Sequence, residues 1–422
     1  NIMKINTKCV QSGYEPQNGE PRVVPVSMST TFKYDSTQTV GDLFDLKADG
    51  FFYTRLANPT TAAVEKKIAD LEGGTAAMLT SSGQAATTLS VLNLASSGDK
   101  IVSSSEIYGG TYNLFNVTLK RMGIDCIFVD PDDTDGLEKA VKTKGVRAVF
   151  GETLANPALK VLDIEKWAKT AHGANVPLIV DNTFATPVLC RPFEFGADIV
   201  IHSTSKYMDG HAVSLGGVIV DGGRFDYKKG GFKQFTEPDE SYHGVVYTES
   251  FKDAPFVTKA RVQLMRDLGS MISPMNAFLL NLGLETLHLR MPRHSENALE
   301  VAEFLKKDKR ILSVSYPGLQ TDGQHAKCKK YMNGSGSGVI SFDVGDKEKA
   351  ARLMDSLQLA KIVVHVADAR TGVLHPASST HRQLSDRELA EAGITPGMIR
   401  LSCGIEDKAD IIADLKQALD NM

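Results

Sequence analysis

The sequence has 422 residues, of which 42% are hydrophobic and 23% are charged, as is typical of globular rather than disordered or membrane proteins. The formal net charge is -4, so the chain lacks the excess of positive charge that marks nucleic-acid and membrane-surface binding. No apolar run approaches the roughly 20 residues that a membrane-spanning helix needs. We therefore expect no nucleic-acid partner and no membrane partner.

The pattern along the chain predicts an arm and two domains, a division that its length also favours. Residues 1–57 are rich in turns and predict an N-terminal arm that reaches a neighbouring subunit. Residues 58–272 alternate short apolar runs with helical patterns, which predicts a large α/β domain with a mostly parallel sheet. Residues 273–422 begin with long helices and continue with strands, which predicts a smaller C-terminal α+β domain.

Several short apolar runs of the large domain read as strands: AAMLT (76–80), KIVSSS (100–105), IDCIFVD (124–130), RAVFGET (147–153), PLIVDNT (177–183), DIVIHST (198–204) and GGVIVDG (216–222). In the smaller domain the candidate strands are GVISFDV (338–344), KIVVHVAD (361–368) and MIRLSCG (398–404). The five cysteines are scattered and form no CxxC pair, which favours reduced thiols in a cytoplasmic protein and indicates neither a disulfide framework nor a metal site.

Polar residues follow the predicted strands of the large domain. Ser81–Gly83, Glu152, Asp181 and Ser203–Lys206 all stand at strand ends. Because ligands bind beyond the carboxyl ends of parallel strands, we expect these residues to gather at one rim of the sheet.

Lys206 is the most unusual residue of this rim. A lysine amine has a reference pKa near 10.4 and becomes a useful nucleophile only when burial or a nearby cation lowers that pKa. The simplest alternative is a lysine that extends to solvent or pairs with Asp209.

Three groups of residues at the same predicted rim favour a covalent role for Lys206. The turn TSSGQAA (80–86) places Ser82 and Gly83 before a helix, where backbone N–H groups bind anions, although a Ser-Gly turn is also an ordinary cap. Asp181 follows a buried strand and there needs a cationic partner such as a protonated pyridine, unless it only caps a turn. Ser203 and Ser205 offer hydroxyls to the same anion. A phosphate cup, a carboxylate and a lysine together match the requirements of pyridoxal 5′-phosphate.

The segment around Lys206, DIVIHSTSKYMDGHAVSLGG, resembles the lysine signature of the Cys/Met-metabolism (transsulfuration) family of pyridoxal-phosphate enzymes. Further matching segments extend over nearly the whole chain: YTRLANPT (53–60), EGGTAAMLTSSGQAA (72–86), YGGTY (108–112), NPALKVLDI (156–164), VDNTFATP (180–187), HPASSTHRQLS (375–385) and IRLSCGIED (399–407). The resemblance implies the aminotransferase-like fold (fold type I), with pyridoxal 5′-phosphate as cofactor.

The resemblance also implies roles for individual residues. Lys206 forms the Schiff base and shuttles protons, Asp181 pairs with the pyridine nitrogen, and Tyr108 stacks on the ring and assists the proton transfers. Ser82, Gly83, Gln84, Ser203 and Ser205 bind the phosphate, Asn156 and Thr183 flank the cofactor, and Tyr53 and Arg55 complete the phosphate site from the adjacent subunit. Arg400 binds the substrate carboxylate as a bidentate fork, with Tyr53 and His365 as further substrate contacts. A shared site of this kind implies a homo-oligomer, a tetramer built as a dimer of dimers.

Two positions depart from the family pattern. Ser205 replaces the usual threonine and keeps its hydroxyl. In the loop VVHVADART (363–371) the family often has Asn- or Ser-Leu-Gly at His365, Val366 and Ala367. The resemblance places this loop beside the substrate carboxylate, so His365 is either a pH-sensitive polar contact or a packed structural histidine.

Within the family, the chain is most similar to the O-acetylhomoserine sulfhydrylase branch, especially in YGGTYNLF (108–115) and in residues 241–274. This branch implies a transferase of methionine biosynthesis that converts O-acetyl-L-homoserine and sulfide, or methanethiol, to L-homocysteine, or L-methionine, and acetate. The alternatives are a methionine or cystathionine γ-lyase, which releases 2-oxobutyrate and ammonia, and a cystathionine γ-synthase. Gly110 counts against a methionine γ-lyase, which typically has cysteine there. A different class is a non-catalytic α/β phosphate-binding module, which predicts no borohydride-fixed adduct on Lys206.

Overall fold

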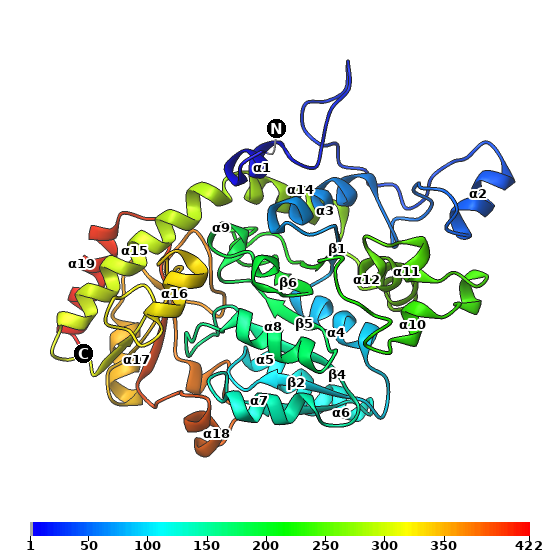
Figure 1. Ribbon diagram of the computed structural model, residues 1–422. Helices are drawn as coiled ribbons and strands as arrows, with labels where there is room; N and C mark the ends of the chain where they lie inside the picture. Colours follow the sequence, from blue (N-terminus) through cyan, green and yellow to red (C-terminus); the bar gives the residue numbers. More distant parts are fainter. Residues whose placement is uncertain (1–2) are drawn as a thin grey trace.

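Residues 3–422, which the computed structural model describes, form two β-sheets with helices packed against each (Figure 1). The larger sheet has seven strands in the spatial order β1 (Ala76–Thr80), β7 (Gly217–Asp221), β6 (Ile199–Ser203), β5 (Leu178–Asp181), β4 (Val146–Glu152), β2 (Lys100–Ser104) and β3 (Asp125–Val129). The strands from β6 to β3 run parallel to one another, and β7 runs antiparallel to both of its neighbours. This sheet confirms the predicted mostly parallel α/β architecture.

Local sequence signals explain where the helices beside this sheet begin. Helix α3 (Pro59–Glu72) starts after Asn58, whose side chain accepts a hydrogen bond from the Thr60 N–H, and it ends at Gly73 with φ of 75°. Ser82 caps α4 (Gly83–Leu94) in the same way. The other helices of this part are α5 (Gly109–Asn113), α6 (Leu119–Arg121), α7 (Thr134–Val141), α8 (Ile164–Gly173), α9 (Thr186–Leu189), α10 (Lys233–Thr236), α11 (Tyr247–Ser250), α12 (Pro255–Lys259) and α13 (Arg266–Leu268).

The smaller sheet has five strands in the order β10 (Lys361–Ile362), β11 (Gly372–Leu374), β12 (Met398–Ser402), β9 (Val339–Asp343) and β8 (Ser313–Ser315). The helices of this part of the chain are α14 (Pro274–Glu285), α15 (Leu287–Lys307), α16 (His325–Met332), α17 (Lys347–Asp355), α18 (Asp386–Glu391) and α19 (Lys408–Asp420). Of these, α14 packs on α3, beside the large sheet. A smaller α+β lobe was therefore predicted correctly, whereas the domain boundaries at residues 57 and 272 stay predictions.

One predicted strand is wrong for most of its length. The sequence predicted a strand over 361–368, but β10 stops at Ile362. Val364 is 71% exposed, and Ala367 adopts a left-handed backbone conformation with φ of 67°. Because an extended strand excludes that conformation, the apolar residues after Ile362 form a loop instead.

The N-terminal region combines a docked helix with a projecting segment. Helix α1 (Ile5–Gln11) packs on α3 through the buried Cys9, and Lys8 forms an ion pair of 2.8 Å with Asp70. The chain between α1 and α3 then leaves the body of the molecule and includes the outlying α2 (Thr37–Phe44), at the upper right of Figure 1.

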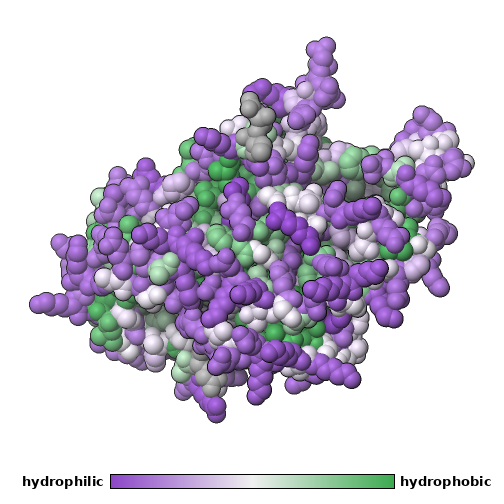
Figure 2. Space-filling view, in the orientation of Figure 1, coloured by the Kyte–Doolittle hydropathy of each residue, from purple (hydrophilic) through white to green (hydrophobic). Residues whose placement is uncertain are grey.

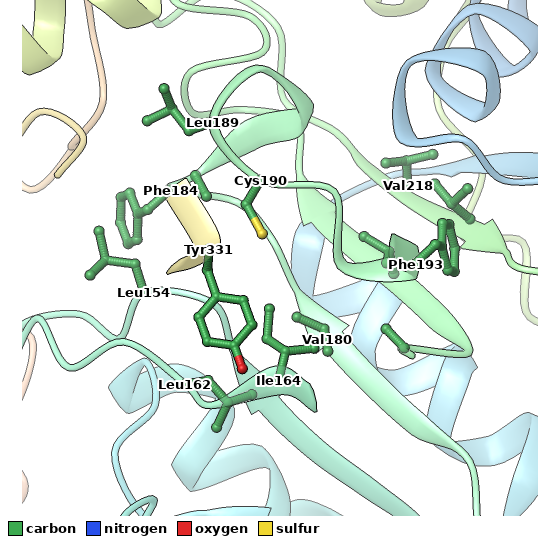
Figure 3. Close-up of a cluster of buried hydrophobic side chains, with 14 of the residues drawn as sticks. Leu154, Leu162, Ile164, Val180, Phe184, Leu189, Cys190, Phe193, Val218 and Tyr331 are labelled. Carbon is green, nitrogen blue, oxygen red and sulfur yellow. The ribbon is translucent and has the colours of Figure 1, made fainter. Parts of the chain in front are cut away.

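A continuous apolar core covers one face of the large sheet, through side chains such as Val149, Val180 and Val200. Figure 3 shows part of it: Tyr331 lies near Leu154 and Phe184, and Val218 of β7 lies near Phe193. The face shown in Figure 2 is mostly hydrophilic, with scattered hydrophobic patches. None of the helices in residues 3–422 has the length and apolarity that crossing a bilayer requires.

Candidate active site

A cavity of about 580 Å³ opens at the carboxyl ends of the parallel strands. Most of the residues predicted for the site line it: Ser82, Gly83, Gln84, Tyr108, Asn156, Asp181, Thr183, Ser203, Ser205, Lys206, His365 and Arg400. Leu154 and Phe184, two of the core residues labelled in Figure 3, also line this cavity. Strand ends of the large sheet and a strand of the small sheet thus enclose one space.

Lys206 lies in the turn after β6, with its amine at the cavity. Burial, and second the charge of Arg400, lower the pKa of this amine to about 8. The nearest polar side-chain contact of Nζ is Nδ1 of His365, at 3.5 Å. A lysine with this pKa is neutral for a substantial part of the time near physiological pH, as attack on an aldehyde requires.

Asp181 ends β5 and is oriented by Thr183. The backbone N–H of Thr183 donates to Oδ1 of Asp181 at 3.0 Å, and the Thr183 hydroxyl donates to the same oxygen. The hydroxyl also accepts from the Ser203 N–H at 2.9 Å, which ties β5 to β6. Both hydrogen bonds that the described residues donate to the side-chain carboxylate of Asp181 end on Oδ1, so Oδ2 is available to a further donor in the cavity.

Glu152 is a second acidic residue of the cavity, noted in the sequence only as a polar strand end. Its Oε1 accepts from the backbone N–H of Tyr108 at 2.7 Å. Burial, and second the nearby Asp181, raise the pKa of Glu152 well above its ordinary range, and burial also raises the pKa of Asp181. Two adjacent buried carboxyls resist double ionisation, which is why burial and proximity favour a protonated form in this pair.

The N-terminus of α4 forms a cup in the cavity wall, close to the end of β6. Oγ of Ser82 accepts from the Ala85 N–H at 3.0 Å, so this hydroxyl acts as the helix cap. A methyl group added at Gly83 would lie 2.6 Å from Cβ of Ser203, so only glycine allows the helix to start this close to β6. The free N–H groups and the helix dipole favour an anion here.

Ser205 is buried in the turn after β6 and is hydrogen-bonded to the backbone of Gly216. Its hydroxyl donates to the Gly216 carbonyl at 3.1 Å and accepts from the Gly216 N–H at 3.0 Å. These two hydrogen bonds join the turn after β6 to the residue that precedes β7. A role for Ser205 in phosphate binding stays a prediction.

Arg400 enters the cavity from β12 of the small sheet. It is 4% exposed, and one guanidinium nitrogen donates to the Val364 carbonyl at 3.2 Å. Burial lowers the pKa of Arg400 to about 10, which still leaves it charged at neutral pH. A buried charged guanidinium with free donors is suited to a carboxylate ligand.

Tyr53 and Arg55 do not line this cavity. The Arg55 guanidinium lies over the Tyr53 ring, 4.8 Å from its centre, and Arg55 borders a separate depression formed with residues 266–269. Their predicted place in the site of an adjacent subunit stays a prediction.

The family model for the Cys/Met metabolism PLP-dependent enzymes matches residues 6–420. The chain belongs to this family. It is 46% identical to O-acetyl-L-homoserine sulfhydrylase of Leptospira meyeri, a match that covers 99% of this chain and 97% of the relative. It is 44% identical to homocysteine synthase of Schizosaccharomyces pombe, with 99% and 98% covered.

Two solved structures share the whole fold. A putative O-acetylhomoserine (thiol)-lyase from Campylobacter jejuni superposes with a TM-score of 0.95 at 39% identity, covering 99% of this chain and 100% of that one. That structure contains N′-pyridoxyl-lysine-5′-monophosphate. Cystathionine γ-lyase from Lactobacillus plantarum superposes with a TM-score of 0.85 at 29% identity, with 99% of both chains covered. These matches confirm fold type I.

The cofactor of this enzyme family is pyridoxal 5′-phosphate, and the cavity residues fit it. Among the described residues, the buried Oδ1 of Asn156 has no hydrogen-bond partner and lies in the cavity wall. The α4 cup suits the phosphate, Asp181 the pyridine nitrogen and Lys206 the aldehyde. The individual roles of these residues remain predictions.

Proposed function

We propose that this enzyme exchanges the acetyloxy group of O-acetyl-L-homoserine for a thiol. Sulfide gives L-homocysteine and acetate, and methanethiol gives L-methionine. The cavity that brings Lys206, Asp181 and Arg400 together carries the proposal. The sulfhydrylase and homocysteine synthase activities named for full-length relatives at 42–46% identity support the choice of substrate.

The exchange breaks the Cγ–O bond of the substrate and forms a Cγ–S bond. When bound, pyridoxal phosphate supplies an electron sink that makes the α-proton of the amino acid acidic. Arg400 binds the α-carboxylate and so fixes the direction in which the side chain points. The neutral amine of Lys206 removes the proton at Cα, assists the loss of a proton at Cβ, and returns protons after the thiol has added.

Other residues support the geometry of these steps. Tyr108 stands at the cavity mouth, 41% exposed, with its backbone fixed by Glu152. Leu154 and Phe184 exclude water from one wall and leave room for a small thiol. Asp181 holds the positive charge of the pyridine nitrogen, which sustains the electron sink.

The proposed assembly is a homotetramer arranged as a dimer of dimers, in which Tyr53 and Arg55 reach the phosphate site of the adjacent subunit. Analytical ultracentrifugation of the holoenzyme tests the assembly. Co-expression of K206A and R55A chains tests the shared site, because a mixed dimer regains one intact site only if Arg55 acts across the interface.

Product analysis tests the reaction itself. The holoenzyme is incubated with O-acetyl-L-homoserine and sulfide, and homocysteine and acetate are quantified. We expect equal amounts of the two products and no homocysteine from K206A. Products dominated by 2-oxobutyrate and ammonia would identify a γ-lyase, the activity named for the Lactobacillus plantarum relative.

A further inference from the structure

The loop after β10 brings a second base to the catalytic lysine. Nδ1 of His365 lies 3.5 Å from Nζ of Lys206, and both side chains line the cavity. Nε2 of His365 is buried and has no hydrogen-bond partner among residues 3–422. When Nε2 carries the ring proton of a neutral imidazole, the lone pair of Nδ1 faces the lysine amine.

The loop that carries His365 is fixed on both sides of this residue. The Val364 carbonyl accepts a hydrogen bond of 3.2 Å from Arg400, and the N–H of Ala367 donates to Oγ of Ser402 at 2.8 Å. Both partners lie on β12. Ala367 adopts a left-handed φ of 67° in making this contact, a conformation that is unfavourable for alanine. His365 is therefore held in place by its neighbours on the chain.

The same loop is tied to the turn that carries Lys206. The N–H of Ala369 donates to the Gly210 carbonyl at 2.9 Å, and the N–H of Gly210 donates to the Lys206 carbonyl at 2.8 Å. The imidazole and the amine thus sit on two backbone segments that are joined to each other. Their proximity follows from this backbone arrangement as well as from the side-chain rotamers.

Charged groups around His365 favour its neutral form. Burial, then the charge of Lys206, lowers the pKa of the imidazole, and Arg400 acts in the same direction. Asp368 and Asp209 act in the opposite direction and do not reverse the shift. An imidazole that stays neutral remains a hydrogen-bond acceptor across the physiological range.

We propose that His365 is a positioning residue of the reaction, whose neutral imidazole accepts a hydrogen bond at Nδ1 from the amine of Lys206. The inference rests on the proposed function, in which Lys206 moves protons at Cα and Cβ. Once the substrate has released the amine of Lys206, Nζ must reach both Cα and Cβ of the substrate and stay close enough to each to transfer a proton. An acceptor on its far side restricts that motion and keeps one face of the amine toward the substrate. This role differs from the contact with the substrate carboxylate that the sequence predicted for His365.

Two substitutions separate an acceptor from a group that only fills space. H365N keeps an acceptor, because the amide oxygen of asparagine extends about as far from the backbone as Nδ1 of histidine, but it does not titrate. H365L keeps the volume and removes the acceptor. H243N is the matched control, since the His243 side chain is 82% exposed.

The first readout is the visible absorbance of the holoenzyme between pH 5 and pH 10, which reports protonation at the nitrogen that joins Lys206 to the cofactor. Loss of the acceptor in H365L should lower the midpoint of this titration by about one pH unit, because the protonated form loses a hydrogen bond. H365N should stay close to the wild type. The titration needs no substrate, so its result stands whether or not the proposed thiol exchange is correct.

The second readout is steady-state kinetics with O-acetyl-L-homoserine and sulfide. We expect kcat of H365L to fall about tenfold or more with little change in KM, H365N to recover most of that loss, and H243N to match the wild type. Thermal melts of all three holoenzymes reveal a merely structural role, which would lower the melting temperature without moving the absorbance midpoint. The proposal is overturned if H365L keeps the wild-type midpoint, or if H365N loses as much kcat as H365L.

Discussion

Gly110 lies against the ring of Tyr108, so we predict that G110A lowers kcat about 100-fold. A methyl group at residue 110 would lie 2.5 Å from Cε1 and 3.0 Å from Cζ of Tyr108. Carbon atoms in contact normally stand about 3.5–4.0 Å apart, so the ring must move by about 1 Å. A displacement of about 1 Å in a catalytic group costs on the order of 10²-fold in rate.

The assay is the initial rate of homocysteine formation at saturating sulfide, with the visible circular dichroism of the bound cofactor as a measure of ring placement. G173A is the matched control, because a methyl group added at the end of α8 meets no atom within 4 Å. G173A should retain the wild-type rate. Wild-type kcat and an unchanged dichroism spectrum in G110A would refute the reasoning, since the ring would then have tolerated the methyl group in place.

Three further predictions address the lysine, the substrate site and the backbone around them. Burial lowers the pKa of the Lys206 amine to about 8, so the rate at which the cofactor-free protein binds pyridoxal phosphate should rise with pH and level off above a midpoint near pH 8. Stopped-flow absorbance measures this rate, and a rate that still increases towards pH 10 would contradict the prediction. R400K should raise KM for O-acetyl-L-homoserine about 10–100-fold with a smaller change in kcat, because the single ammonium charge of lysine replaces a guanidinium that can bind both carboxylate oxygens. Equal KM values for the two enzymes would exclude Arg400 from carboxylate binding. R290M should lower the free energy of unfolding in urea by about 3 kcal/mol, because Arg290 donates to the buried carbonyls of Tyr207 at 2.7 Å and Gly283 at 2.6 Å. An unchanged urea midpoint would contradict that role.

The sequence allowed the rim of the large sheet to be predicted because strand ends are readable from local patterns. Apolar runs that stop at Asp181 and Ser203 locate the carboxyl ends of β5 and β6, and parallel topology then brings those ends together. The family resemblance added residues that no local pattern marks, such as Arg400, which reaches the cavity from a different sheet. The structure places all three of these residues around the same cavity.

Other features depend on contacts that are distant in the sequence. The hydrogen bond from the Tyr108 N–H to Glu152 joins residues 44 positions apart, and no spacing rule predicts it. The prediction of a strand through Ala367 was wrong because β-propensity carries no information about contacts that are distant in the sequence. Here the N–H of Ala367 donates to the Ser402 hydroxyl, and Ala367 adopts a left-handed backbone conformation. The predicted place of Tyr53 in the site of an adjacent subunit stays a prediction, because no pattern within one chain locates a contact with a second chain.

The ratio of homocysteine to 2-oxobutyrate, measured in one reaction at rising sulfide concentrations, tests the proposed thiol exchange most directly. If the enzyme is a γ-replacement catalyst, homocysteine dominates and its share rises with sulfide, while the total consumption of O-acetyl-L-homoserine equals the acetate released. A product mixture dominated by 2-oxobutyrate and ammonia, and unaffected by sulfide, would contradict the proposed function.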